Sequence, residues 1–207
     1  MKRFFLTFCT SILLLTDHAF AERVLPADKQ VCRSKFALCT SAPCVPDPSA
    51  PGDQAICTCE VTEGPNFADK TRCKDRGPKA IATIKGMAAT QIISTYAFVQ
   101  ATTKPVMTCA NDTPWTDCLN AKCIVDPKDP LKAICTCPYY DAEKSGKVAT
   151  FVTYGGSCNT STCETAVWSA ATVEAFKDGS KALMEFMNIA KSDEPWAMCA
   201  GHSLDRP

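Results

Sequence analysis

The sequence is poor in histidine and has no excess of charge of either sign. It has only two histidines, and its 22 basic and 22 acidic residues balance without long runs of one sign. Nucleic-acid binding needs a basic footprint, so we expect no nucleic-acid partner. Gly155-Gly156 is a lone glycine pair and forms no phosphate-binding motif.

Long apolar runs are also missing beyond the N-terminus. Basic residues, an apolar stretch over residues 4–15 and the small-x-small sequence Ala19-Phe20-Ala21 are typical of a signal peptide over residues 1–21. Charged residues interrupt the later alanine-rich stretches, so we expect no transmembrane segment and a soluble mature protein. Cys9 lies inside the apolar run and not at the cleavage point, which argues against a lipid anchor.

The short leader indicates a bacterial protein that is exported to the periplasm or the outer membrane, with release from the cell as the alternative. A eukaryotic secreted protein is a further alternative, for which Asn111-Asp112-Thr113 and Asn159-Thr160-Ser161 would be glycosylation acceptors.

Cysteine, by contrast, is abundant. Of the 15 cysteines all but Cys9 follow the leader, and an even number in an exported chain predicts a disulfide framework. The sequence does not give the connectivity: Cys109 aligns with Cys32 as an opening cysteine and equally with Cys199 as a closing one, so a bridge between the two halves is possible. The expected structural cysteines are Cys32, Cys39, Cys44, Cys57, Cys59, Cys73, Cys109, Cys118, Cys123, Cys135, Cys137, Cys158, Cys163 and Cys199.

One pattern of cysteines occurs twice. Residues 39–59 contain Cys-x4-Cys, a β-branched residue, Asp-Pro and then the pentapeptide AICTC, and residues 118–137 repeat this order with one residue fewer. Such agreement indicates an internal duplication. We therefore expect a small disulfide-rich α+β fold of two tandem repeats, residues 22–108 and 109–207, each a disulfide-bonded β/loop module followed by a helix.

Apolar spacing predicts the other elements. Steps of three and four residues predict a helix at about 79–103, and similar spacing at about 164–191 predicts two helices separated at Asp178-Gly179-Ser180, the first capped by Ser161 and Glu164. Alternating and aromatic residues at about 134–154, with a turn at 143–146, predict a hairpin that the first repeat lacks.

Each AICTC reads as a central strand. Cysteines two apart on a strand face the same side about 7 Å apart, so each is expected to bond a separate partner. Thr58 and Thr136 should face the other side, whereas Ile56 and Ile134 are expected in the core.

Metal and redox chemistry are the alternatives for these cysteines. A zinc or copper site would combine Cys-x-Cys with Cys39 and Cys44, or with Cys118 and Cys123, but structural zinc sites favour Cys-x2–4-Cys pairs, often with histidine. A redox-active pair usually has a thioredoxin-like setting, which is not evident here. We expect no metal and no cofactor.

Catalysis is not expected either. His202 is the one histidine after the leader and lies near the chain end, and Asp126 and Asp129 fall in a proline-rich loop. We therefore expect no enzyme and no small-molecule substrate.

The remaining function is binding to other proteins. Tyr139, Tyr140, Phe151 and Tyr154 on the expected hairpin are residue types enriched at interfaces; the alternative is that they belong to the core. The favoured function is a non-enzymatic structural or protein-interaction protein. A secreted effector or protease inhibitor acting through the loops 43–51 or 126–130 is the alternative, and a periplasmic thiol or metal protein is a third class.

Two resemblances bear on this expectation. The Cys-x-Cys spacing superficially resembles that of EGF-like or Notch-like modules, but those lack helices of the expected length. An exported, unlipidated, duplicated Cys-rich chain with alanine-rich helices is similar to the small Cys-rich accessory proteins in the outer-membrane cap of Dot/Icm-type (type IVB) secretion systems. This resemblance implies a structural subunit lodged among other subunits of a large bacterial envelope complex.

Overall fold

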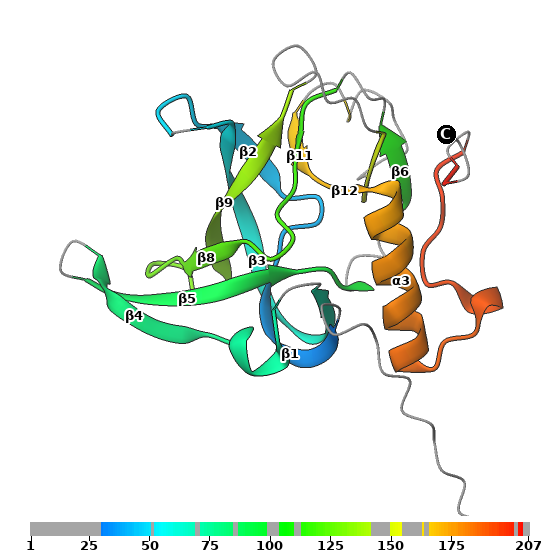
Figure 1. Ribbon diagram of the computed structural model, residues 1–207, viewed down its shortest axis with the longest axis horizontal. Helices are drawn as coiled ribbons and strands as arrows, with labels where there is room; N and C mark the ends of the chain where they lie inside the picture. Colours follow the sequence, from blue (N-terminus) through cyan, green and yellow to red (C-terminus); the bar gives the residue numbers. More distant parts are fainter. Residues whose placement is uncertain are drawn as a thin grey trace, which may run out of the picture.

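The computed structural model describes residues 30–50, 52–68, 71–84, 87–98, 104–109, 113–141, 150–154, 163, 166–200 and 203–204. Within them the chain forms a nine-stranded sheet, a three-stranded sheet and one α-helix, α3 (Figure 1). The elements are β1 Gln30–Leu38, β2 Pro43–Pro46, β3 Gln54–Ala68, η1 Cys73–Asp75, β4 Lys79–Ile84, β5 Met87–Thr95, β6 Val106–Cys109, β7 Trp115–Thr116, β8 Lys122–Val125, β9 Lys132–Tyr140, β10 Phe151–Tyr154, β11 Val167–Ser169, β12 Ala171–Thr172, α3 Val173–Met187 and η3 Lys191–Asp193.

The large sheet curls into two rings of strands that share the antiparallel pair β3–β9. One ring runs β1–β3–β9–β8–β5 and is closed by parallel pairing of β5 with β1. The other runs β7–β9–β3–β2–β11 and is closed by parallel pairing of β11 with β7. The pair β3–β9 therefore lies at the centre of the fold, and its inner side chains are the most enclosed.

Alternation along β3 and β9 separates an inner face from an outer one. Residues 55, 57, 59 and 61 of β3 are buried while 56, 58 and 60 are exposed, and β9 alternates in the same way from residue 132 to 139. Successive side chains of a strand point to opposite faces, so the cysteines of both AICTC segments share the inner face.

The small sheet, ordered β12–β10–β6, packs with α3 on the other side of the molecule (Figure 1). Thr172 caps α3 by accepting a hydrogen bond from the Ala175 N–H, and Asn188 ends it in the left-handed conformation at φ 55°. Gly179 sits in the middle of the helix, where an added Cβ would lie 3.0 Å from Tyr96 Cδ1 and 3.1 Å from Phe67 Cδ1. Glycine here permits close approach of helix and sheet.

A buried arginine closes the far end of the β1–β3 pair. Arg76 is fully buried and donates hydrogen bonds to the carbonyl oxygens of Asn66 at 2.9 Å, Thr71 at 2.8 Å and Ala68 at 3.2 Å. Burial lowers the pKa of Arg76 to about 10. Its acceptors are carbonyls at the end of β3 and in the loop that follows, so the side chain links these segments.

The predicted helix at about 79–103 is wrong, because residues 79–84 and 87–95 form strands β4 and β5. Seven isoleucines and threonines lie between residues 79 and 95, and β-branched side chains favour strands. Pairing of β5 with β8 and with β1 supplies the tertiary contacts that a three- and four-residue spacing does not reveal.

The two helices predicted at about 164–191 are replaced by one. Residues 167–169 are strand β11, and α3 continues through Asp178-Gly179-Ser180 because Gly179 packs against aromatic rings and does not end the helix. The proposed cap at Ser161 and Glu164 lies outside the described residues.

The hairpin predicted at about 134–154 is also wrong. Strand β9 belongs to the large sheet, where it pairs with β3, β7 and β8, whereas β10 pairs with β6 and β12 in the small sheet. The predicted turn at 143–146 lies outside the described residues, as do the leader, Cys158, His202 and both candidate glycosylation asparagines.

The fold is mostly β and is not an α+β array of two tandem modules. Strands of both predicted repeats belong to one sheet, in which four strands of the second half lie between strands of the first. Helix α3, from the second half, is the one α-helix among the described residues. No tandem repeat of a β module followed by a helix is evident there. What the halves share is a disulfide-bonded hairpin, described below.

Six disulfides indicate an oxidising, extracytoplasmic location. In the part of the chain that the structure describes, no helix combines the length and the apolar character needed to cross a membrane.

Candidate functional site: the disulfide core and the surface above it

The two AICTC segments lie side by side. In the β3–β9 ladder Cys57 faces Cys135, Ala55 faces Cys137 and Cys59 faces Ala133. This antiparallel register relates the two pentapeptides by an approximate two-fold axis between Cys57 and Cys135. The duplicated sequence is thus placed at the junction of the two strand rings.

Each pentapeptide is bonded to the Cys-x4-Cys segment before it. The connectivity is the same in both hairpins: Cys39–Cys59 and Cys44–Cys57 in the first, Cys118–Cys137 and Cys123–Cys135 in the second. The prediction that neighbouring cysteines take separate partners is confirmed. Both partners lie on one segment, however, so each AICTC strand is linked to one neighbour and not to two.

Backbone contacts follow the same symmetry. Ser41 and Asn120 occupy corresponding left-handed turns, at φ 63° and 64°. The Ser41 N–H donates to the Ser169 carbonyl at 3.1 Å, and the Asn120 N–H donates to the Ser94 carbonyl at 3.0 Å. The correspondence between the two hairpins therefore extends beyond the cysteines to β11 and β5, the strands that close the two rings.

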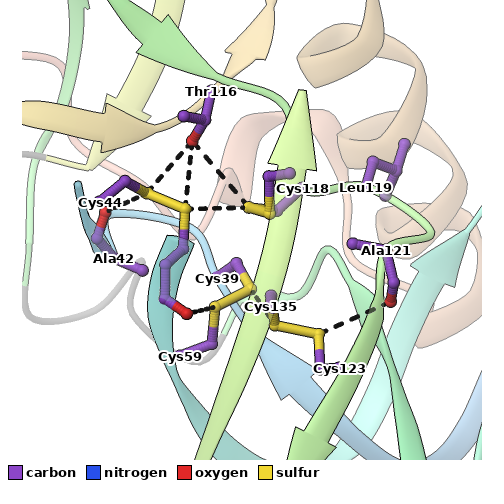
Figure 2. The surroundings of a disulfide bond; sticks show 12 residues. Cys39, Ala42, Cys44, Cys59, Thr116, Cys118, Leu119, Ala121, Cys123 and Cys135 are labelled. Atoms are coloured by element: carbon purple, nitrogen blue, oxygen red, sulfur yellow. Dashed lines mark hydrogen bonds between the residues drawn. A yellow bond between two sulfur atoms is a disulfide. The ribbon is translucent and has the colours of Figure 1, made fainter. Parts of the chain in front are cut away.

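The four central disulfides touch in pairs across the two-fold axis. Cys39 Sγ lies 3.3 Å from Cys135 Sγ, and Cys118 Sγ lies 3.4 Å from Cys57 Sγ (Figure 2). A disulfide sulfur carries no proton, so these are van der Waals contacts and not hydrogen bonds. They join the two hairpins into one packed sulfur cluster, which we call the disulfide core.

Thr116 of β7 covers one side of the disulfide core. Its hydroxyl oxygen lies 3.2 Å from Cys44 Sγ, 3.4 Å from Cys57 Sγ and 4.0 Å from Cys118 Sγ (Figure 2). The hydroxyl also donates to the Trp168 carbonyl at 3.4 Å. The side chain is fully buried, so it closes the sulfurs off from water.

Metal binding is the obvious alternative for so many clustered sulfurs. Two groups have their sulfur atoms within 4.8 Å of one another: Cys39, Cys123 and Cys135, and Cys44, Cys57 and Cys118. A metal ligand is a thiolate, whereas each of these sulfurs is bonded to another sulfur. The oxidised cluster therefore offers cross-links and no ligand set.

Two further disulfides lie away from the disulfide core. Cys32 bonds Cys73, and Cys109 bonds Cys163. Cys109 thus corresponds to Cys32, and all the described bridges stay within one half of the chain. Cys199 is disulfide-bonded as well.

The four aromatic residues predicted to bind a partner lie mainly in the interior. Phe151 is fully buried with its ring 5.5 Å from that of Trp115, and the half-buried Tyr140 stacks on Trp115 at 4.7 Å. Tyr139 and Tyr154 are buried. Their surroundings therefore agree with the alternative interpretation, in which these residues belong to the core.

Tyr154 takes part in a buried group of hydroxyls. Its OH lies 2.9 Å from that of Tyr96, which lies 3.0 Å from Ser180 Oγ of α3. Burial raises the pKa of both tyrosines, and the Tyr96–Tyr154 contact raises that of Tyr96 further. The group joins the two sheets and the helix.

The aspartates of the predicted loop act locally. Asp126 Oδ1 accepts from the Lys128 N–H at 2.8 Å, and Asp129 Oδ1 accepts from the Leu131 N–H at 3.1 Å. These are turn-forming contacts.

The outer side of the four hairpin strands carries neighbouring exposed apolar side chains. Val45 is 70% exposed, Ile56 41% and Ile134 38%, while Ile124 is half-buried. Val45 pairs with Ile56, and Ile124 with Ile134. We call this surface the outer face; it consists of Val45, Ile56, Thr58, Glu60, Ile124, Lys132, Ile134 and Thr136.

Sequence reasoning missed the outer face because it assigned Ile56 and Ile134 to the core. That expectation is wrong: with period two, each isoleucine must share the side of the threonine two residues later, opposite the cysteines. The alternation Ile-Cys-Thr-Cys was the available signal.

A second surface feature is a groove of about 870 Å³ between α3 and the C-terminal segment. Phe176, Met184 and Trp196 line it together with Lys177, Lys181, Glu185, Lys191 and Glu194. The mixture of apolar side chains with both signs of charge favours no single class of ligand.

Comparison with protein-family models, with curated proteins and with solved structures finds no match for this chain.

Proposed function

We propose that the protein is a non-enzymatic exported interaction protein that docks other proteins on its outer face. The observation that supports this most is the contrast between the two sides of one sheet: four disulfides on the inner side, and solvent-exposed Val45, Ile56 and Ile134 on the outer side. Isolated exposed apolar side chains are ordinary, whereas neighbouring ones on a sheet mark interaction surfaces.

The disulfide core gives such a surface a useful property. Each hairpin is cross-linked at two successive inward positions, and the hairpins are joined by the β3–β9 ladder. A surface held in one conformation loses little entropy on binding, which favours association.

The partner class is other protein subunits. The resemblance noted above points to a structural subunit of a bacterial envelope secretion complex, and the oxidising location inferred from the disulfides is compatible with the periplasm or the outer membrane. A disulfide-rich effector or inhibitor in the medium is the alternative.

Affinity purification from crosslinked envelopes tests the proposal. The wild-type protein and the variant Ile56→Glu/Ile134→Glu are compared by mass spectrometry, with Met187→Glu on α3 as the control, since Met187 is 40% exposed and lies off the outer face. We expect one defined set of envelope proteins with wild type and control, and its loss with the double variant. Recovery of the same proteins by a folded double variant would overturn the proposal, as would finding the protein only in the medium.

A further inference from the structure

We propose that the outer face also joins two copies of this chain, sheet against sheet, with Glu60 of each copy facing Lys132 of the other. This inference rests on the proposed function, because it uses the same surface and names one partner for it. The outer face carries three rows of side chains, each formed by one residue of β3 and the residue of β9 beside it.

The rows are set by the β3–β9 register. Ile56 stands beside Thr136, Thr58 beside Ile134, and Glu60 beside Lys132. All six side chains are exposed. The surface thus has an apolar centre and, at one end, an acidic and a basic residue next to each other.

A two-fold axis that runs parallel to the strands, above the line between β3 and β9, makes this surface complementary to itself. Rotation about it brings β3 of one copy over β9 of the other without shifting residues along the strands. Ile56 then meets Thr136 of the second copy, Thr58 meets Ile134, and Glu60 meets Lys132. Each interaction occurs twice, as in any isologous interface.

The charges at the end of the outer face are accessible for such contacts. Within the described residues no ion pair involves Glu60, and Lys132 Nζ lies 3.7 Å from Asp129 Oδ2 in an exposed pair. An exposed pair of this kind is weak, so Lys132 can reorient toward a second carboxylate at little cost.

The area of the outer face indicates how strongly two copies can associate. Four strands spaced about 4.8 Å apart, over six residue steps, cover roughly 20 Å by 20 Å. The total of about 800 Å² for two copies lies below the standard interface size of about 1,600 Å². We therefore expect a dimer that dissociates at micromolar concentration.

Charge reversal separates contacts between copies from contacts within one copy. In the Glu60→Lys variant the end of each outer face carries two lysines, and in the Lys132→Glu variant it carries two glutamates. Like charges would therefore meet twice in the homodimer of either variant. We expect each variant to lose at least about tenfold in dimer affinity. An equal mixture of the two variants restores opposite charges across the interface but not within a chain.

Sedimentation equilibrium over a range of concentrations is the measurement. The expected result is a wild-type dimer, weakened association for each variant alone, and a dimer of wild-type affinity in the mixture. Lys191→Glu and Glu194→Lys, exposed on and next to η3, are controls that should dimerise as the wild type does. A wild type that stays monomeric, or a mixture no stronger than the single variants, overturns the dimer. Loss of envelope partners from Ile56→Glu/Ile134→Glu would still support the proposed function in that case.

Discussion

The two largest core clusters among the described residues differ in the side chains that form them. In the core around β3 and β9, eight of the 15 buried residues are half-cystines and Tyr139 is the one aromatic residue. The core under α3 holds Phe67, Tyr96, Phe98, Tyr154 and Phe176. The rings of the last four are linked by contacts with one another and with Trp196. Covalent bonds hold the first, and packing of large side chains holds the second.

The difference concerns how each region withstands perturbation. Disulfides act chiefly by restricting the unfolded chain, so the disulfide core depends on redox state. The aromatic core, the second of the two, depends on volume and on buried hydroxyls, and therefore on side-chain size and pH. The outer face, which we propose as a docking surface, lies on the first region, whose covalent bonds make it the less sensitive of the two to small packing changes.

The largest effect is expected from removing the two central cross-strand bonds. Cys44→Ala/Cys57→Ala combined with Cys123→Ala/Cys135→Ala removes about 3 kcal/mol per bond from the loop-closure contribution and also opens cavities in the disulfide core. This exceeds half the stability of an ordinary domain, and we expect a chain that does not fold cooperatively. Near-UV circular dichroism and guanidinium unfolding measure it.

Cys32→Ala/Cys73→Ala is the control for that experiment, because it removes one bond outside the disulfide core, between the buried Cys32 and the exposed Cys73. It should lose about 4 kcal/mol and still unfold in one transition. If the four-alanine variant is as stable as this control, the disulfide core is not the main support of the sheet.

Phe176→Ala should have the next largest effect, about 3–5 kcal/mol, because its buried ring contacts Tyr96, Tyr154 and Trp196. Phe186→Ala on the same helix is the matched control, since Phe186 is 48% exposed, and should stay within about 0.5 kcal/mol. Equal losses for the two variants would mean that α3 does not pack as described. Urea unfolding gives both values.

Gly179→Ala tests the close approach of α3 to the sheet. Alanine favours a helix interior by about 1 kcal/mol, but its Cβ would meet the Tyr96 and Phe67 rings at 3.0 and 3.1 Å. Overpacking of this kind costs about 1–3 kcal/mol, so we expect a net loss of about 1 kcal/mol. Exposed Lys181→Ala is the control, and a more stable Gly179→Ala protein would contradict the packing.

Alkaline pH should destabilise the aromatic core by the smallest amount. The pKa values of Tyr96 and Tyr154 are raised by burial, so the unfolded chain releases these protons first. The two protonated tyrosines contribute fully to the free energy of unfolding below pH about 10, and this contribution is lost as the pH rises further. The midpoint of thermal unfolding should fall above that pH, less steeply for Tyr154→Phe, whereas an unchanged slope would place the ionising groups elsewhere.

The cysteine pattern predicted the disulfide core well, because spacing on a strand restricts which sulfurs can meet. It identified the AICTC strands and predicted that the two cysteines of each strand bond separate partners, but it did not say which cysteines those partners are. It did not give the register that sets Cys57 opposite Cys135, since strand pairing between distant segments depends on the whole fold.

The elements around the disulfide core were predicted less well. The apolar residues of 79–95 are spaced as in a helix, but many of them are β-branched. Pairing of β5 with β1 and β8 favours strands over a helix. Gly179 looked like a helix break because the rings of Phe67 and Tyr96, far away in the sequence, were not visible as its neighbours. The outer face could have been predicted from the alternation of Ile-Cys-Thr-Cys, which places Ile56 and Thr58 on the side opposite the cysteines. The assignment of Ile56 to the core overlooked this alternation.

Site-specific photo-crosslinking in intact cells tests the central claim most directly. A photoreactive residue is placed at Ile56 on the outer face, or at Met187 on α3, and the crosslinked products are identified by mass spectrometry. The account predicts defined protein adducts from position 56 and none from position 187. Adducts from position 187 alone, with none from position 56, would contradict the claim that the protein acts through the face above its disulfide core.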